Sequence, residues 1–118
     1  MSYLLLIIEP RDQRRARTPE EAQLAYAQMV GFSEDLKARG LLMAAESLRS
    51  DAEGVRVSLR DGKRTLLDGP FTEAKEMVGG FFMLDCATKE QAIAIAGECP
   101  AAAWASVEVR EVGPCHSG

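Results

Sequence analysis

The apolar run from Tyr3 to Ile8, closed by Glu9 and Pro10, is the feature that most constrains the fold of this chain. It reads YLLLII, with no polar residue at alternate positions. Strict alternation is typical of a strand with one face in water, whereas a continuous run is typical of a strand buried on both faces. We therefore expect residues 3–10 to form a strand in the middle of a sheet, with cover required on both sides.

A long helix with clear ends is predicted between Thr18 and Gly40. Thr18 suits the N-cap position, and Glu21, three residues later, completes a capping box in which each side chain binds the backbone N–H of the other residue. Pro19 suits the first helical position, and Gly40 suits the position just after the last turn. Residues at helical spacing predict one buried face. They are Ala22, Tyr26, Met29, Phe32 or Ser33, and Leu36.

The remaining apolar segments predict five strands and a second helix. Residues 55–60, VRVSLR, alternate between apolar and polar side chains, as in a half-exposed strand. The Asp61-Gly62 pair that follows is typical of a tight hairpin turn. A second helix is expected from the capping residue Thr88 to Pro100, which stops it. The other expected strands span residues 41–48, 63–67, 79–86 and 104–112.

This order of elements predicts an α+β fold. With the hairpin treated as an insertion, the long elements follow the split β-α-β order of a ferredoxin-like domain. The sheet would be mainly antiparallel, with both long helices on one face. Its other face would carry an excess of apolar residues, so we expect a second copy of the chain to cover it and form a homodimer. We expect a single domain over residues 1–113 and a flexible tail over residues 114–118.

Composition argues against several classes of function. The 118 residues are 47% hydrophobic and 27% charged, with a net charge of -4, as is typical of a soluble globular domain. A nucleic-acid interface is not expected, because no basic patch is interleaved with aromatic residues. The basic run RDQRRAR at residues 11–17 is expected to be a solvated loop. A membrane segment is not expected either, because the longest apolar run is too short and no signal peptide surrounds it.

The three cysteines and the single histidine show no metal-ligand spacing. Cys86 and Cys99 are expected to be small core residues, because no histidine lies near them to activate a thiolate. Cys115 and His116 fall in the expected tail and suggest no role. An odd number of cysteines without ligand spacing is typical of a reduced, cytoplasmic protein. We expect no metal and no other cofactor.

The segment TLLDGPFTEAKEMVGGFFMLD, residues 65–85, concentrates more polar and conformationally special residues than a simple connection needs. Pro70 disfavours the helical conformation at the residue before it, so the chain must turn or extend there. Thr72 suits the N-cap of a short helix over residues 73–78, which the glycine pair at 79–80 would end.

Two interpretations of this segment stay open. In the first, it is an architectural joint that connects a hairpin to a central strand. In the second, it forms the rim of a pocket, where Asp68 and Glu73 act as hydrogen-bond acceptors or proton-transfer groups and Lys75 binds an acid. Nothing in the spacing fixes the distance between the two carboxylates.

The motif LLDGPFTEAKEMVGGFFMLD closely resembles the signature of the YCII-related, DGPF-domain family of small bacterial proteins. The resemblance extends to YLLLIIEP, ARGLLMAAESL and ECPAAAWASVEVREV, and so covers nearly the whole chain. It implies a ferredoxin-like subunit that pairs through its sheet as a dimeric α+β barrel. It also implies a cleft near the dimer interface, with the DGPF turn at its rim. On this chain the implied site comprises Asp68, Gly69, Pro70, Phe71, Glu73 and Lys75.

The resemblance does not name a reaction. Smaller YCII-related members resemble enzymes in which a histidine on the first helix faces an acidic residue. Here that helix contains no histidine, and Tyr26 is its only protonatable aromatic residue, so the same mechanism cannot be transferred. Some DGPF-domain relatives occur beside or fused to sigma-factor-type regulators, which implies a regulatory role.

Three hypotheses about function follow. In the first, the protein binds a small anionic molecule and catalyses proton transfer of a lyase or isomerase type, with Asp68 or Glu73 as the base. The residues expected to contact this ligand are Gly69, Pro70, Phe71, Lys75 and Tyr26. In the second, a non-catalytic module senses a metabolite through the same cleft. In the third, the DGPF turn is purely architectural in a dimeric interaction protein.

Overall fold

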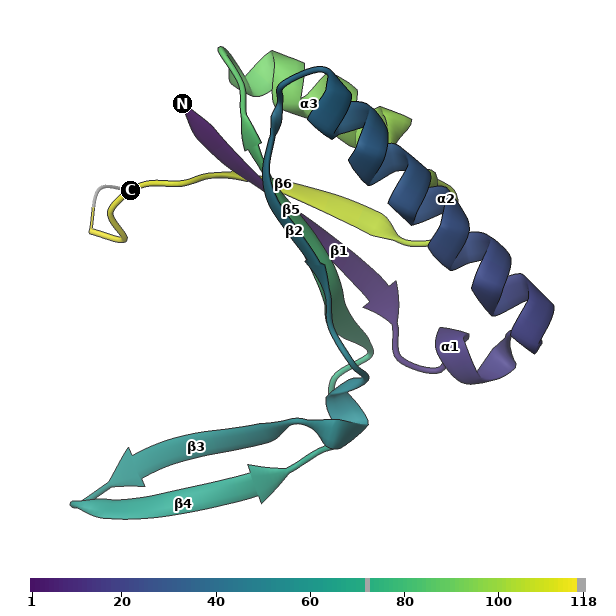
Figure 1. Cartoon of the computed structure of the whole chain (residues 1–118). Coiled ribbons are helices and arrows are strands. Elements are labelled where there is room, and N and C mark those ends of the chain that lie inside the picture. The colour runs from purple at the N-terminus through teal and green to yellow at the C-terminus, as the bar shows by residue number, and fades with distance from the viewer. Residues whose placement is uncertain (72, 117–118) are drawn as a thin grey trace.

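A computed structural model describes residues 1–71 and 73–116. The protein forms a four-stranded sheet with helices on one side, and a two-stranded hairpin projects away from it (Figure 1). The strands are β1 (Ser2–Pro10), β2 (Leu42–Ser47), β3 (Val55–Arg60), β4 (Lys63–Asp68), β5 (Glu76–Asp85) and β6 (Ser106–Glu111). The α-helices are α1 (Gln13–Ala16), α2 (Pro19–Ala38) and α3 (Lys89–Glu98). Two short 3-10 helices are η1 (Asp51–Glu53) and η2 (Pro100–Ala103).

Strand β1 lies inside the sheet, as its continuous apolar sequence predicts. The strands follow the order β2-β5-β1-β6, and every neighbouring pair is antiparallel. Leu5 of β1 lies opposite Phe82 of β5 on one side and opposite Val109 of β6 on the other. The expected α+β architecture with a mainly antiparallel sheet is therefore confirmed.

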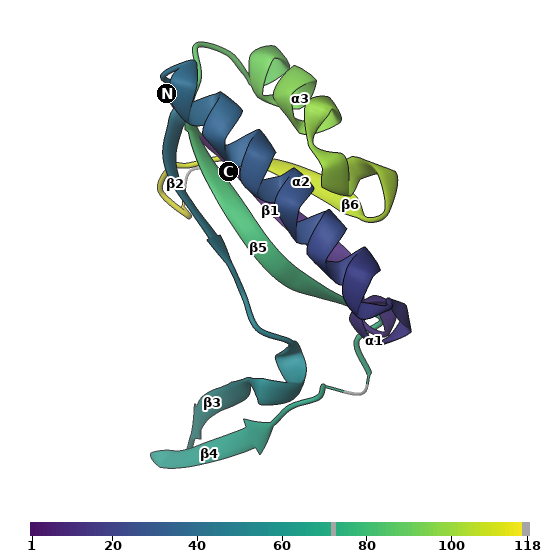
Figure 2. The ribbon, with the colours of Figure 1, turned by 45° about the vertical axis from the view of Figure 1, so that its right-hand side comes forward.

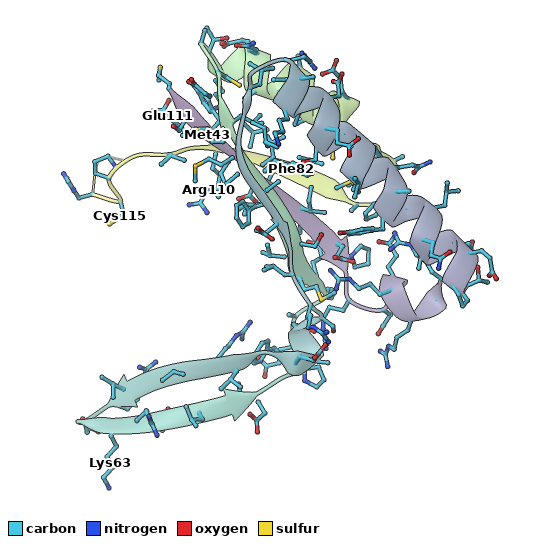
Figure 3. All side chains as sticks on the ribbon, in the orientation of Figure 1. Met43, Lys63, Phe82, Arg110, Glu111 and Cys115 are labelled. Carbon is cyan, nitrogen blue, oxygen red and sulfur yellow. The ribbon has the colours of Figure 1, made fainter. Side chains whose placement is uncertain are left out.

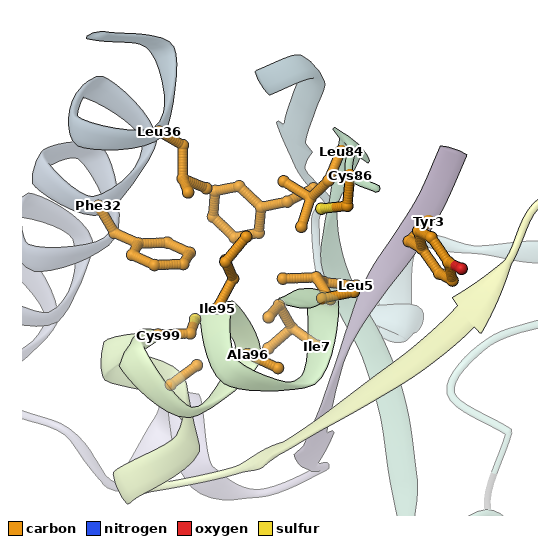
Figure 4. Close-up of a cluster of buried hydrophobic side chains, with 13 residues drawn as sticks. Tyr3, Leu5, Ile7, Phe32, Leu36, Leu84, Cys86, Ile95, Ala96 and Cys99 are labelled. Atoms are coloured by element: carbon orange, nitrogen blue, oxygen red, sulfur yellow. The ribbon is translucent and has the colours of Figure 1, made fainter. Parts of the chain in front are cut away.

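Helices α2 and α3 cover one face of this sheet (Figure 2). Leu5 of β1 points beneath them and is fully buried. Phe32 of α2 meets Phe82 of β5 edge-on, with ring centroids 5.2 Å apart. Ile95 of α3 joins the same cluster (Figure 4). The core is thus a single layer between two helices and one sheet face.

Cys86 and Cys99 are buried in this core, as the sequence predicts. Burial is the main cause that raises the pKa of each thiol. Both side chains therefore stay protonated near neutral pH and act as small apolar residues.

Both long helices begin at the predicted caps. The N–H of Glu21 donates to Thr18 Oγ1 at 3.1 Å, and the N–H of Thr18 donates to Glu21 Oε1 at 2.9 Å. In α3 the N–H of Gln91 donates to Thr88 Oγ1 at 3.1 Å. Local capping chemistry therefore fixes where both helices start.

Strands β3 and β4 form the predicted hairpin. Asp61 and Gly62 have φ values of 53° and 77°, the positive φ that a two-residue hairpin turn requires. The register of the two strands places four apolar side chains on one face of the hairpin. They are Val55, Val57, Leu59 and Leu66, each between 52% and 67% exposed. The hairpin is therefore amphipathic, and its apolar face is uncovered in the single subunit.

The base of the hairpin is held by contacts around η1. Arg11 Nε lies 3.1 Å from Asp51 Oδ2, and both side chains are largely buried. The N–H of Gly69 donates to the carbonyl of Gly54 at 2.8 Å. A Cβ on Gly69 would overlap the carbonyl oxygen of Asp51. Glycine is therefore required at this position of the DGPF turn by close backbone approach.

The short helix predicted over residues 73–78 is wrong. Residues from Glu76 onward belong to β5, which pairs with β1 from the Pro10–Glu76 position. Pairing along the central strand overrides the local helix signal, as tertiary contacts often do. Thr72, the predicted N-cap, lies outside the described residues.

Gly79 and Gly80 lie inside β5 and do not end a helix. A Cβ on Gly79 would overlap Glu9 Oε1, and a Cβ on Gly80 would lie 2.8 Å from the carbonyl oxygen of Glu46 in β2. The pair therefore lets a buried carboxylate and a neighbouring strand approach the backbone closely.

Replacing Gly79 by alanine should destabilise the protein, because the added methyl group would displace the Glu9 carboxylate. We expect the free energy of unfolding to fall by about 3 kcal/mol, the order associated with breaking a buried ion pair. Urea denaturation followed by circular dichroism measures the change.

Gly31→Ala is the matched control, because the added Cβ would meet no atom within 4 Å apart from the neighbouring residues of α2 itself. Alanine is the better helix former, so this variant should gain up to about 1 kcal/mol. Equal stability of the two variants would contradict the role assigned to Gly79.

Candidate functional site

A groove of about 580 Å³ runs between the sheet and α2, from Ala22 to Ser33 of this helix. We call it the α2 groove. Its walls are α2 on one side and β2 with β5 on the other, while α1 and the residue after η2 contribute to one end. Its apolar lining includes Ile7, Met29, Val30 and Phe82, and its polar lining includes Glu9, Arg14, Arg17, Tyr26, Ser33 and Trp104.

The α2 groove exists because only the second half of α2 packs into the core. Phe32 and Leu36 are the buried residues of this helix. Nearer its start, Ala22 and Ala25 offer only methyl groups, and Tyr26 is 62% exposed. The prediction that Tyr26 belongs to a buried face is therefore wrong.

A buried ion pair forms part of the groove wall. Glu9, near the end of β1, is 3% exposed. Arg14 Nη2 donates to Glu9 Oε1 at 2.7 Å, and Arg14 Nε lies 3.2 Å from both carboxylate oxygens. Arg14 also donates to the carbonyl of Leu48 at 2.9 Å and to that of Gly79 at 3.4 Å. The protein itself therefore satisfies both charges, as buried charges require.

Arg17 brings a second cation to the groove. Its Cζ atom lies 4.4 Å from the centroid of the Trp104 ring, a cation–π contact. The side chain of Gln13 donates to the carbonyl of Trp104 at 2.6 Å and so helps to hold that residue. The buried Trp104 Nε1 has no hydrogen-bond partner within residues 1–71 and 73–116. Within the same described residues, Arg17 forms no ion pair.

Among the residues predicted to form a site, Tyr26 lines the α2 groove and the others do not. Asp68 ends β4, where it pairs with Val55 across the hairpin, and its side chain is exposed. Glu73 and Lys75 are also exposed, in the connection that precedes β5. The catalytic or binding role proposed for these three side chains stays a prediction.

Gly69, Pro70 and Phe71 lie at the base of the hairpin. The Gly69-Pro70 peptide bond is cis. The Phe71 ring is half-buried, with the Arg56 guanidinium carbon 3.8 Å from its centroid. Phe71 and Arg56 also line a second hollow beside η1, and Leu48 lines both this hollow and the α2 groove. The turn thus packs the hairpin against the rest of the protein, and a ligand contact at these residues stays a prediction.

Sequence reasoning missed Glu9, Arg14 and Arg17. The run at residues 11–17 was expected to be a solvated loop, but it contains α1, and the side chains of Arg11, Arg14 and Arg17 are partly buried. A signal was present, because an acidic residue directly after a buried strand needs a cation nearby. Sequence alone did not show which of the arginines would supply it.

Within the described residues, no three histidine, cysteine, aspartate or glutamate side chains gather as a metal site requires. In the same part of the chain, no helix has both the length and the apolar character needed to cross a bilayer. The α2 groove offers a ligand apolar surface, the hydroxyl groups of Tyr26, Ser33 and Ser47, and the cation of Arg17, which forms no ion pair with the part of the chain that the structure describes. The acidic residue Glu46 also borders it.

Known proteins resemble this chain over most of its length. The model of the YCII-related domain matches residues 1–116. An uncharacterized protein of Rhizobium meliloti (strain 1021) is 39% identical over 93 residues, which cover 79% of this chain and 75% of the relative. The chain therefore belongs to the YCII-related domain family.

Proposed function

We propose that this YCII-related protein binds a small molecule in the α2 groove and works as a homodimer. The observation that carries the binding function is the groove of about 580 Å³ with an apolar lining and a cation. Small-molecule sites commonly measure about 300 to 1,000 Å³ and combine apolar walls with a few polar groups. A groove kept open by small alanine side chains on α2 therefore suits an occupant.

Binding explains this groove better than proton transfer does. Both oxygens of Glu9 already accept hydrogen bonds from Arg14. A general base must reach the proton of its substrate, and here a guanidinium competes for each oxygen. Asp68 and Glu73, the expected bases, lie outside the groove. Lyase or isomerase chemistry at those residues remains a separate hypothesis.

The same observation favours a ligand-sensing module as the second candidate function. A sensor needs a ligand site and a surface that reports occupancy, but it needs no reacting group. The α2 groove supplies the first, and the projecting hairpin offers the second (Figure 1). We therefore retain the hypothesis of a regulatory module of the kind associated with sigma-factor-type transcription regulation.

We further propose that a second copy covers the open face of the sheet. The register of β1 with β5 places an apolar cluster on the side away from the helices. Its members are Leu4, Leu6, Ile8, Val78, Phe81 and Met83. Phe82 points toward α2, whereas Met43 and Arg110 lie on the opposite side (Figure 3). The strand order supports a ferredoxin-like subunit, and pairing through the open face would make a dimeric α+β barrel.

The hairpin supports the same partner through its charge. Residues 55–68 contain four basic and two acidic side chains, a net charge of +2. The whole chain has a net charge of -4, which leaves -6 for the remaining residues. The hairpin of one copy is therefore attracted to the body of another. An isolated two-stranded hairpin is marginally stable in water, so its apolar face gains most from such cover.

Filling the α2 groove should abolish ligand binding. Ala25→Phe places a ring in the groove from α2, so the thermal shifts that metabolite-library hits produce in the wild type should disappear. A ligand present at 100 times its Kd stabilises a protein by about 2.7 kcal/mol, which differential scanning fluorimetry detects easily.

Ala27→Phe is the matched control, because this residue is exposed on the same helix and does not line the groove. It should retain the thermal shifts. Shifts that survive in Ala25→Phe would contradict the groove as the site. A library without any hit would contradict the binding function, and turnover of a hit would favour an enzyme over a sensor.

Val57→Asp should dissociate the dimer, because it places a charge in the apolar face of the hairpin. The single subunit should tolerate the change, since Val57 is 62% exposed. Sedimentation velocity should give twice the chain mass of 12.8 kDa for the wild type and 12.8 kDa for this variant. Thr65→Asp changes the opposite face of the hairpin and should remain dimeric. A monomeric wild type at every concentration would overturn the proposed assembly.

A further inference from the structure

The charged groups of the α2 groove differ in how much of their hydrogen-bonding capacity is already used. Arg14 donates to both oxygens of Glu9 and to two backbone carbonyls. These two side chains therefore have little to offer a ligand. Within the described residues, Arg17 makes a cation–π contact with Trp104 and forms no side-chain hydrogen bond or ion pair. The N–H groups of its guanidinium are therefore available for bidentate binding of a carboxylate.

Arg17 forms no ion pair with Glu21, the acidic residue about one helical turn later in the sequence. The pKa of Glu21 is lowered first by the backbone hydrogen bond from Thr18, and the charge of Arg17 is the smallest of the causes. The Glu21 carboxylate already accepts the Thr18 N–H at 2.9 Å. Arg17 is therefore a cation whose acidic neighbour is occupied elsewhere.

The start of α2 does not compete for an anion. Helix N-termini bind anions through free backbone N–H groups. Here the capping box closes this site, because Thr18 Oγ1 accepts the N–H of Glu21. An anionic group in the α2 groove would therefore bind through the Arg17 side chain. The single positive charge of Arg17 balances a monoanion such as a carboxylate, whereas it would leave one charge of a phosphate dianion unpaired.

Glu46 of β2 also borders the groove, but the register places it opposite Phe81, on the open face of the sheet. The rest of the lining is apolar or neutral. Ile7, Met29, Val30 and Phe82 provide apolar surface, while Tyr26 and Ser33 provide hydroxyl groups. Trp104 Nε1 is one more donor without an acceptor among the described residues. A ligand matched to this lining carries one anionic end and an apolar body.

On these grounds we propose that the α2 groove takes an amphipathic monocarboxylate, with its carboxylate at Arg17 and its apolar body between α2 and the sheet. This inference rests on the proposed binding function and narrows its ligand class. Ion pairing to a partly desolvated guanidinium supplies the selectivity for the acid over a neutral isostere. Apolar contacts supply the part of the affinity that the acid and its neutral isostere have in common.

Matched pairs of acid and amide test the proposal. Phenylacetate is compared with phenylacetamide, and hexanoate with hexanamide, so that charge changes while size is nearly constant. Trp104 is the only tryptophan of the chain and lines the groove, so its fluorescence reports binding, and isothermal titration calorimetry confirms the Kd. We expect each acid to bind the wild type at least about tenfold more tightly than its amide, a difference of about 1.4 kcal/mol.

Arg17→Gln should reduce this acid-to-amide ratio to within about twofold while leaving the Kd of the amides nearly unchanged. Arg15→Gln is the matched control, because Arg15 is exposed in α1, pairs with Asp12 and does not line the groove. It should keep the wild-type ratio. Thermal melts of both variants show that each is folded.

The outcomes separate this inference from the function on which it rests. Equal binding of acid and amide to the wild type, or a ratio unchanged in Arg17→Gln, would overturn the carboxylate inference. If acid and amide bind equally and Ala25→Phe abolishes the binding of both, the α2 groove is a site for another class of ligand. If neither acid binds, the inference fails, and the metabolite library then decides whether the binding function fails with it.

Discussion

The arrangement of this protein depends on the pairing of β1 with β5 on one side and β6 on the other. Because side chains alternate across a strand, β1 sends Leu5 and Ile7 beneath the helices and Leu6 to the open face of the sheet. The same alternation places Glu9 on the helix side, beyond the part of α2 that packs into the core. One strand therefore supplies the core, a wall of the groove and the surface proposed for a second copy.

The position of Glu9 explains several residues that lie far from it in the sequence. A buried carboxylate needs a cation and hydrogen-bond donors, which Arg14 supplies from the helix that follows β1. It also needs space in the neighbouring strand, which the absence of a side chain at Gly79 provides. The backbone of Leu48 completes this assembly, because its carbonyl accepts from Arg14 and its N–H donates to the carbonyl of Gly79.

The sequence predicted those features that depend on neighbours along the chain. The capping residues Thr18 and Thr88 and the hairpin turn at Asp61 each act within a few residues, and all three are found as expected. The order of strands and helices also predicted the mixed fold, because periodicity reports which segments can be buried. Local chemistry was therefore a reliable guide to the hairpin turn and to where the two long helices begin, but not to the short helix predicted over residues 73–78.

The candidate groove could not be predicted in the same way, because its contacts join distant segments. Arg17 meets Trp104, and Glu9 meets Gly79, across most of the chain. The spacing of apolar residues in α2 predicted one face of the helix. It could not show that the helix packs into the core only after Tyr26.

The motif that joins β4 to β5 contains some residues that packing explains and others that it does not. Gly69 is explained by the nearby carbonyl of Asp51, and Gly79 by the carboxylate of Glu9. Phe71 is explained by its packing against Arg56 at the hairpin base. Packing gives no comparable account of the exposed side chains of the motif, which are Asp68, Glu73 and Lys75. The glycines and the aromatic residue thus position the hairpin and the groove, whereas the charged residues are free to meet a partner or a ligand.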